Sequence, residues 1–209
     1  MMAIAKKELK GYFLSPIGYV FLGVLFLMFG LYYYVVLLSQ VSSLIPQVYS
    51  MLFIWIELIL LPLITMRSFS EEIRNKTDQG LLTAPVGVFS IVFGKFLAAF
   101  FMFAIAMTAT LIPAVVITFF SSPDWATIFG TYLGTLLCGA AFLSIGIFIS
   151  SLTQSQIVAA ISTFGVTLLL LLVGQLSSSV SNTALANFFT WISFDTRYQK
   201  FTKAVLLTL

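Results

Sequence analysis

Histidine is absent from this chain of 209 residues, cysteine occurs once, and charged residues make up only 8% of the sequence. Zinc and redox-metal centres are held mainly by histidine and cysteine side chains, so the sequence predicts no metal site. A lone cysteine, Cys138, excludes a disulfide framework within the chain. The ten basic residues form no stripe interleaved with aromatic side chains, so we expect no nucleic-acid partner.

Apolar residues are abundant instead, at 60% of the chain. Soluble domains are about one quarter charged, so this composition indicates a membrane protein. Five apolar runs reach the length of about 20 residues that a helix needs to cross a bilayer. They cover residues 17–38, 48–66, 89–120, 126–150 and 157–176. We therefore predict an all-α polytopic membrane helix bundle, a single transmembrane domain over residues 1–209 with five complete spans.

Basic residues are unevenly distributed between the two sides of this predicted bundle. One side carries Lys6, Lys7, Lys10, Arg67, Arg74, Lys76 and Lys95. The loops at 39–47 and 121–125 carry none, so the excess of lysine and arginine in cytoplasmic loops places the N-terminus in the cytoplasm. Three further basic residues follow the fifth run, on the side that an odd number of spans places outside. No small-residue cleavage site follows the first run, which we interpret as a retained span.

Two segments outside the runs have an amphipathic character. In residues 1–16, apolar side chains recur at helical spacing while Lys6, Lys7 and Lys10 occupy the other side. This pattern predicts a helix lying on the lipid of the inner membrane face; the alternative is a basic flank that only sets orientation. Residues 177–203 are first polar and then aromatic, which suits short interfacial helices on the outer side.

The densest group of charges lies in residues 67–85, RSFSEEIRNKTDQGLLTAP. Ser68 and Glu71 have the spacing of a capping box, and Pro85 is a stop signal, so we predict one short amphipathic helix between them. Such a helix could rest on lipid as a connector or dock on a protein partner. Acidic residues among the basic ones favour a protein groove, since a lipid-binding helix is mainly basic.

Glu57 is the only acidic residue inside a predicted span. Ionisable residues at this depth usually face the interior of the bundle, because exposure to lipid is costly. Two interpretations remain open: a carboxylate on a substrate or proton path, and a carboxyl group hydrogen-bonded between helices. The absence of a second intramembrane charge slightly favours the hydrogen-bonded group.

A longer pattern in residues 61–99 resembles a known family. It consists of Pro-Leu-x-Thr-Met, an arginine, paired glutamates, a threonine, Leu-Leu-x-x-Pro and Gly-Lys. These features fall on Pro62, Leu63, Thr65, Met66, Arg67, Glu71, Glu72, Thr77, Leu81, Leu82, Pro85, Gly94 and Lys95. The pattern is similar to that of the permease subunits of type-2 ABC exporters, in particular the branch with the gliding-motility permease of Bacteroidetes. Two positions depart from it: Lys76 replaces a glycine, and Gly80 replaces a larger residue.

The resemblance implies that residues 67–85 are a coupling helix, which lies in a groove of a separate ATP-binding subunit. The residues implied to contact that partner are Phe69, Glu71, Glu72, Ile73, Thr77 and Leu81. The resemblance also implies a bacterial inner-membrane location, a pair of permeases as homodimer or heterodimer, and a sixth span that residues 204–209 begin. No G-x-x-x-x-G-K-[ST] motif is present, so we expect ATP and Mg²⁺ on the partner and neither cofactor nor enzymatic activity in this chain.

We therefore expect the permease subunit of an ATP-driven ABC exporter, in which a coupling helix links ATP hydrolysis on another subunit to transport. The alternative is a non-transporting membrane anchor or scaffold for a cytoplasmic complex. A secondary carrier is disfavoured, because the sequence shows no internal repeat and a single intramembrane charge.

Overall fold

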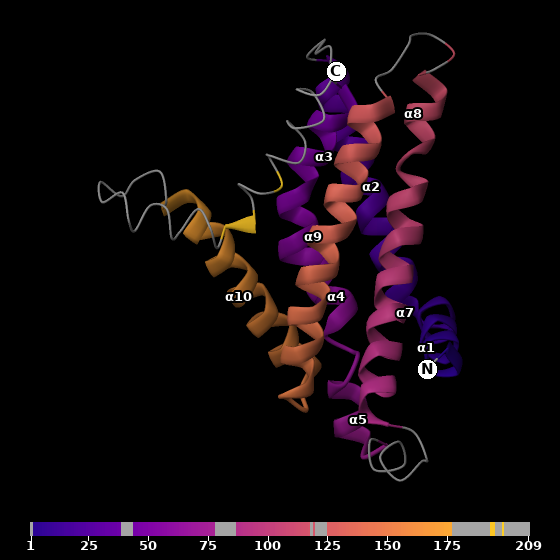
Figure 1. The fold of residues 1–209 in the computed structure, drawn as a ribbon, viewed down its shortest axis with the longest axis vertical. Helices are drawn as coiled ribbons and strands as arrows, with labels where there is room; N and C mark the ends of the chain where they lie inside the picture. Colours follow the sequence, from indigo (N-terminus) through magenta and orange to yellow (C-terminus); the bar gives the residue numbers. More distant parts are fainter. Residues whose placement is uncertain are drawn as a thin grey trace.

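The computed structural model is a bundle of helices (Figure 1). It describes residues 2–38, 44–77, 87–117, 119, 125–176, 193–194 and 198. Five helical segments in these parts are long and apolar enough to cross a membrane: Pro16–Leu38, Gln47–Asn75, Val88–Ile117, Trp125–Ser151 and Gln156–Val173. They coincide with the five predicted runs, and the described residues contain no strand. The prediction of an all-α polytopic bundle is therefore confirmed.

Helix α1 (Met2–Leu14) precedes the first span, α2 (Pro16–Leu38). Pro16 fits the first turn of α2, because the N–H that proline lacks has no partner at that position. A Cβ atom on Gly18 would lie 2.2 Å from the carbonyl oxygen of Tyr12. Glycine at this position therefore allows the start of α2 to pass close to the backbone of α1.

The second span changes its helical type halfway along. It begins as α3 (Leu44–Trp55), becomes the π-helix η1 (Ile56–Leu60) and continues as α4 (Leu61–Thr65). The backbone N–H directly after η1 bonds to the carbonyl of the first η1 residue, five positions earlier. Pro62 follows at once, and in a regular α-helix its ring would clash with the carbonyl four residues before it. The wider π turn thus changes the hydrogen-bond register just ahead of the proline.

The third span is interrupted near its far end. Helix α7 (Val88–Ala109) ends at Thr110, and α8 (Ile112–Ile117) begins two residues later. Pro113 lies in the first turn of α8, where its missing N–H costs little. The hydroxyl of Thr110 donates to the carbonyl of Met107 at 2.6 Å, inside the last turn of α7. The break is therefore a consequence of the proline.

The fourth span, α9 (Trp125–Ser151), packs against the second, third and fifth spans. Two of its glycines lie at very close helix approaches. A Cβ atom on Gly139 would lie 2.3 Å from the ring of Phe103, and one on Gly146 would lie 2.3 Å from Oγ1 of Thr65. Small residues at helix interfaces permit such approaches, so these glycines set how closely α9 packs.

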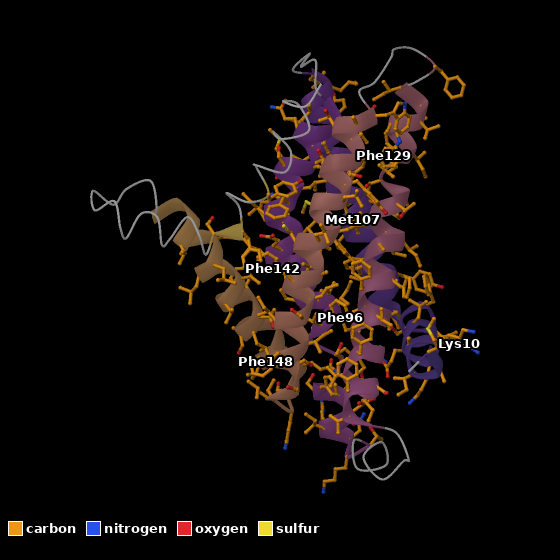
Figure 2. The ribbon with its side chains drawn as sticks, viewed as in Figure 1. Lys10, Phe96, Met107, Phe129, Phe142 and Phe148 are labelled. Atoms are coloured by element: carbon orange, nitrogen blue, oxygen red, sulfur yellow. The ribbon has the colours of Figure 1, made fainter. Side chains whose placement is uncertain are left out.

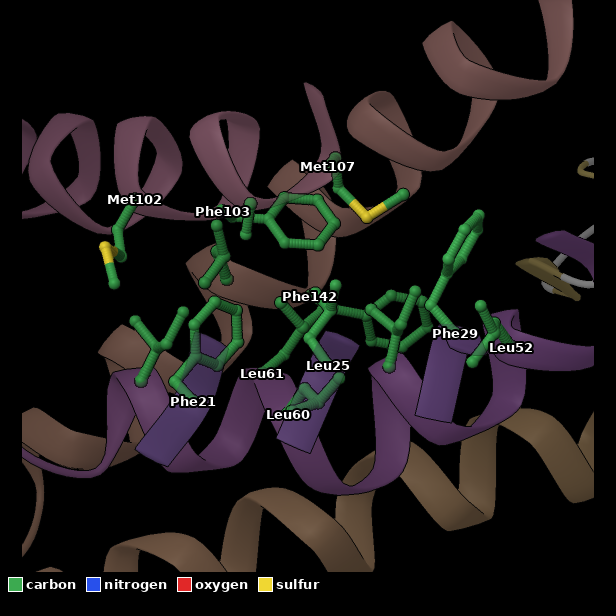
Figure 3. Packing of buried hydrophobic residues seen from close by; sticks show 14 of the residues in the cluster. Phe21, Leu25, Phe29, Leu52, Leu60, Leu61, Met102, Phe103, Met107 and Phe142 are labelled. Atoms are coloured by element: carbon green, nitrogen blue, oxygen red, sulfur yellow. The ribbon is translucent and has the colours of Figure 1, made fainter. Parts of the chain in front are cut away.

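Large apolar side chains from the first four spans fill the interior of the bundle (Figure 3). Those labelled in the figure are Phe21, Leu25, Phe29, Leu52, Leu60, Leu61, Met102, Phe103, Met107 and Phe142. All ten are at most 6% exposed. Because lipid is as apolar as these side chains, close packing rather than exclusion from water stabilises such an interior in a bilayer.

The fifth span, α10 (Gln156–Leu176), diverges from the bundle along its length (Figure 1). Its inner face is small and polar: Ala159, Thr163 and Thr167 are buried. Both threonine hydroxyls donate to carbonyl oxygens one turn earlier in α10, at 2.8 and 2.9 Å. Its other side exposes large aliphatic residues such as Ile161, at 65%.

Most of the predicted outer interfacial segment, residues 177–203, lies outside the described residues, as do residues 204–209. Tyr198 is an exception and packs on the bundle. Its ring stacks on Phe53 with centroids 3.9 Å apart, and its hydroxyl shares a hydrogen bond of 3.1 Å with Thr135. This part of the segment therefore contacts the second and fourth spans.

Candidate functional site

The chain after the second span meets α1 at one end of the bundle, opposite α8 (Figure 1). A turn follows Thr65, and the short helix α5 (Ser70–Asn75) comes next. We refer to residues 67–77 as the junction segment. Its contacts with α1, α7 and α9 are together called the charged junction.

The predicted capping box at the start of this helix is not formed. Helix α5 begins after Phe69, with no side-chain cap from that residue, and Ser68 precedes it as a buried residue. Glu71 instead forms an ion pair with Arg67, four residues earlier. The prediction is wrong because a capping box is a local pattern, whereas both of its side chains here have other partners.

Ser150 of α9 supplies the missing cap from a distant part of the chain. Its Oγ atom accepts hydrogen bonds from the N–H of Phe69 at 3.1 Å and from the N–H of Ser70 at 3.2 Å. The same hydroxyl lies 3.3 Å from the carbonyl oxygen of Met66 and donates to it. The first N–H groups of a helix lack partners within the helix, so Ser150 both stabilises α5 and fixes its start to α9.

Helix α5 ends at Lys76, which has left-handed backbone angles of φ 55° and ψ 24°. The N–H of Thr77 bonds to the carbonyl of Glu72 at 3.0 Å, and the N–H of Lys76 bonds to that of Ile73 at 3.2 Å. This is the Schellman pattern of helix ends, which favours glycine because a Cβ atom is strained in the left-handed region. The exporter pattern has glycine at this position, and Lys76 replaces it with some strain.

The predicted single helix over residues 67–85 is therefore wrong. Among the described residues the helix covers Ser70–Asn75 only, and the left-handed Lys76 that follows it turns the chain. Residues 78–86, which include Leu81, lie outside the described residues.

Lys95 of α7 is the residue that joins the elements of the charged junction. Its Nζ atom donates to the carbonyl oxygen of Ser68 at 2.7 Å. The same atom lies 2.9 Å from Oε1 of Glu72 and 3.2 Å from Oε1 of Glu8 in α1, and 5.0 Å from the ring centroid of Phe69. The side chain is only 2% exposed. An ammonium group has three donors, and three oxygen partners here offset the cost of its burial.

Both acidic residues predicted to contact a partner are thus used within the chain. Glu71 pairs with Arg67, and Glu72, 16% exposed, pairs with Lys95. Ile73 is half-buried, and Phe69 packs against the bundle core. The residues that the junction segment leaves exposed are Arg74, Asn75, Lys76 and Thr77. The accessible surface of this segment is therefore its tip, which is basic in the described part.

Tyr12 fixes α1 to the end of the second span. Its hydroxyl is buried and donates to the carbonyl of Ile64 at 3.2 Å. Burial raises the pKa of Tyr12 to about 12, although a hydrogen bond with the Ser68 side chain acts in the opposite sense. The phenol therefore keeps its proton near neutral pH and remains a hydrogen-bond donor.

The outer side of α1 is basic, as the sequence predicted. Lys6, Lys7 and Lys10 are exposed, and Figure 2 shows Lys10 pointing away from the bundle. On its inner side, a polar cavity of about 220 Å³ lies between α1 and the junction segment, with Glu8 and Arg67 among its lining residues. Direct apolar packing therefore does not fill the space between these two elements.

Glu57 lies in η1, at the change of helical type in the second span, and is 1% exposed. The structure thus places this carboxyl group inside the bundle, away from lipid. Single π turns within α-helices are frequent at functional sites. Among the described residues, no group of three or more cysteine and acidic side chains is placed to hold a metal ion.

Sequence reasoning missed Ser150 and Glu8, and it treated Lys95 as a motif position and as one of the basic residues on the cytoplasmic side. Each acts through a partner far along the chain: Ser150 lies 80 residues from Ser70, and Lys95 lies 87 residues from Glu8. One available signal was Lys95 near the start of the third apolar run, because a lysine buried at that point needs an acidic partner.

Comparison with known proteins gave one result. The family described as "ABC-2 family transporter protein" matches residues 2–208. No curated protein and no solved structure matches the chain. The match covers almost the whole chain, and the five apolar helices agree with a multi-pass membrane protein. The chain therefore belongs to the ABC-2 family of transporter membrane proteins.

Proposed function

We propose that this chain is the permease subunit of an ATP-driven exporter and that the tip of its junction segment docks on a separate ATP-binding subunit. Membership of the ABC-2 family supports a transport component that works with such a subunit and is not itself a catalytic enzyme. ATP and Mg²⁺ then bind to the partner. Coupling requires that the two subunits share a contact whose geometry differs between transport states.

The proposal is supported mainly by the difference between the two sides of residues 67–77, one attached to the bundle and the other exposed. One side is fixed to α9 by Ser150 and to α7 by Lys95, and Lys95 in turn binds Glu8 of α1. The other side ends in an exposed basic tip that includes Arg74 and Lys76. A segment built in this way can receive a displacement at its tip and pass it to the spans.

The test is charge reversal at the tip. We expect Arg74→Glu combined with Lys76→Glu to abolish co-purification with the ATP-binding subunit and its stimulation of ATP turnover. The matched control is Lys6→Glu combined with Lys10→Glu, which reverses two exposed lysines on α1 at the same end of the molecule. Normal binding and turnover in the Arg74/Lys76 variant would exclude docking through this tip. Binding without any effect on ATP turnover would instead favour a membrane scaffold.

The orientation in the membrane is part of the proposal. The junction segment and α1 lie at the same end of the bundle (Figure 1), so the basic residues Lys6, Lys7, Lys10, Arg67, Arg74, Lys76 and Lys95 belong to one side. Cytoplasmic sides are enriched in lysine and arginine. We infer an inner-membrane protein with a cytoplasmic N-terminus and α1 on the lipid surface; an N-terminal tag accessible from outside the cell would contradict it.

Two finer assignments rest on the sequence pattern of residues 61–99. The first is a gliding-motility exporter, tested by replacing the permease of a gliding bacterium with this chain and scoring movement. The second is a pair of permeases around the transport path. Mass measurement of the purified complex in lipid nanodiscs separates a homodimer from a heterodimer, and a single permease per complex would exclude both.

A further inference from the structure

The three partners of Lys95 belong to two elements that border the polar cavity, α1 and the junction segment. Ser68 and Glu72 belong to the junction segment, and Glu8 belongs to α1. Lys95 itself belongs to α7. The ammonium group therefore lies where three elements meet, and it uses all of its donors there.

This ammonium group decides whether Glu8 of α1 and Glu72 of the junction segment are held together or repel each other. Oε1 atoms of Glu8 and Glu72 both lie within 3.2 Å of the same Nζ atom, so the two carboxylates are close to each other. Their side chains are only 23% and 16% exposed, which limits screening by solvent. Without the positive charge, the two carboxylates repel each other.

We propose that Lys95 is a positioning residue that makes α1 move together with the junction segment, so that the N-terminal helix is part of the coupling unit. This inference rests on the proposed docking of residues 67–77. A displacement of the tip then reaches α7 and α1 through one ammonium group, in addition to the path into α9 through Ser150. Tyr12, which bonds to the end of the second span, gives α1 its second attachment.

The experiment measures the position of α1 relative to the end of α9 by electron-spin distance measurement. Labels are attached at Lys10→Cys on α1 and Leu152→Cys after α9, in a Cys138→Ser background; Lys10 and Leu152 are exposed and lie outside the charged junction. The permease is reconstituted with its ATP-binding subunit and measured without nucleotide and with Mg-ATP.

We expect one narrow distance distribution without nucleotide and a second, shifted one with Mg-ATP. Lys95→Met should broaden the nucleotide-free distribution toward longer distances, because Glu8 and Glu72 then repel each other, and should abolish the shift. Adding Glu8→Gln to Lys95→Met should restore a narrow nucleotide-free distribution, since the repulsion is gone. Lys6→Met, which removes an exposed lysine from the same helix, should change neither distribution.

Three outcomes would overturn the inference. The first is an unchanged distance distribution in Lys95→Met, and the second is a distribution that stays broad when Glu8→Gln is added. The third is a wild-type distance that does not change with Mg-ATP although the complex forms and turns over ATP. If Lys95→Met does not fold, the single variant Glu8→Gln provides the test. It removes one ionic contact of Lys95 and should reduce the change in label distance caused by Mg-ATP. A permease that never binds the ATP-binding subunit contradicts the proposed function instead. In that case the nucleotide-free distances still show whether Lys95 positions α1.

Discussion

Two neighbouring contacts on one face of α9 join this helix to the end of the second span, and they are of opposite kinds. At Gly146 the two helices are in close steric contact, because there is no room for a Cβ atom beside Thr65. Four residues later, Ser150 reaches the start of α5 through directional hydrogen bonds. Residues four apart lie on the same helix face, so the change happens within one turn.

This difference separates a fixed part of the molecule from a part suited to move. A close-packed contact is sensitive to any added atom and transmits displacement as a rigid body. A polar contact is sensitive to the loss of one partner, and it can be exchanged for water at a modest net cost. The charged junction, held by Ser150, Lys95 and Tyr12, is of the second kind. We therefore expect conformational change to begin there and the α4–α9 contact to carry it onward.

The largest effect is expected at the close-packed contact. Gly146→Val places side-chain atoms where Thr65 already lies, and overpacking of this kind costs about 3 kcal/mol of unfolding free energy. Gly165→Val is the matched control, because no atom lies within 4 Å of a Cβ there. Thermal unfolding in detergent should show a large loss for the first variant and almost none for the second. Equal losses would remove the steric account.

The next effect is expected at the polar contact one turn away. Ser150→Ala leaves the N–H groups of Phe69 and Ser70 without their acceptor, at a cost of about 1.5 kcal/mol. Hydrogen exchange at these two amides should speed up clearly. Ser144→Ala is the control, since among the described residues that hydroxyl bonds within its own helix, to Ala141 at 2.6 Å. Unchanged exchange in Ser150→Ala would show that the cap is not needed.

A smaller effect is expected at Tyr12. Tyr12→Phe removes the donor to Ile64 and should cost about 1 kcal/mol near neutral pH. Burial raises the folded-state pKa from 10.0 to about 12, so the stability that Tyr12 adds is complete below pH 10 and is lost as the pH rises toward 12. Denaturant unfolding at several pH values should show the difference between the two proteins shrinking over that range. A constant difference would contradict a buried, protonated phenol.

The smallest effect is expected at Lys76, and it is a gain. Lys76→Gly relieves the strain of a left-handed lysine, partly offset by the entropy of glycine, for a net gain of about 0.5 kcal/mol. Arg74→Gly, inside α5, should instead lose stability. Protease resistance of the junction segment measures both. A loss in Lys76→Gly would show that the lysine side chain contributes more than its backbone costs.

The sequence was sufficient for the spans, because long apolar runs at bilayer length admit few other structures. It failed for the junction segment. The Ser68–Glu71 pattern indicated a local cap, whereas the cap comes from Ser150, and nothing local to either residue specifies that pairing. The helix end at Lys76 was also missed, since lysine rarely adopts a left-handed conformation. The π turn at Glu57 was also missed, because the spacing of apolar residues does not reveal a local change of hydrogen-bond register.

Docking of the junction segment on an ATP-binding subunit is tested most directly by site-specific photo-crosslinking in the intact membrane. A photoreactive residue at Asn75, on the exposed tip of α5, is compared with one at Phe119, which is 81% exposed near α8 at the opposite end. We expect a crosslink from position 75, and not from position 119, to the chain that carries the P-loop. A complex that forms without any crosslink from position 75, or with one from position 119, would contradict it.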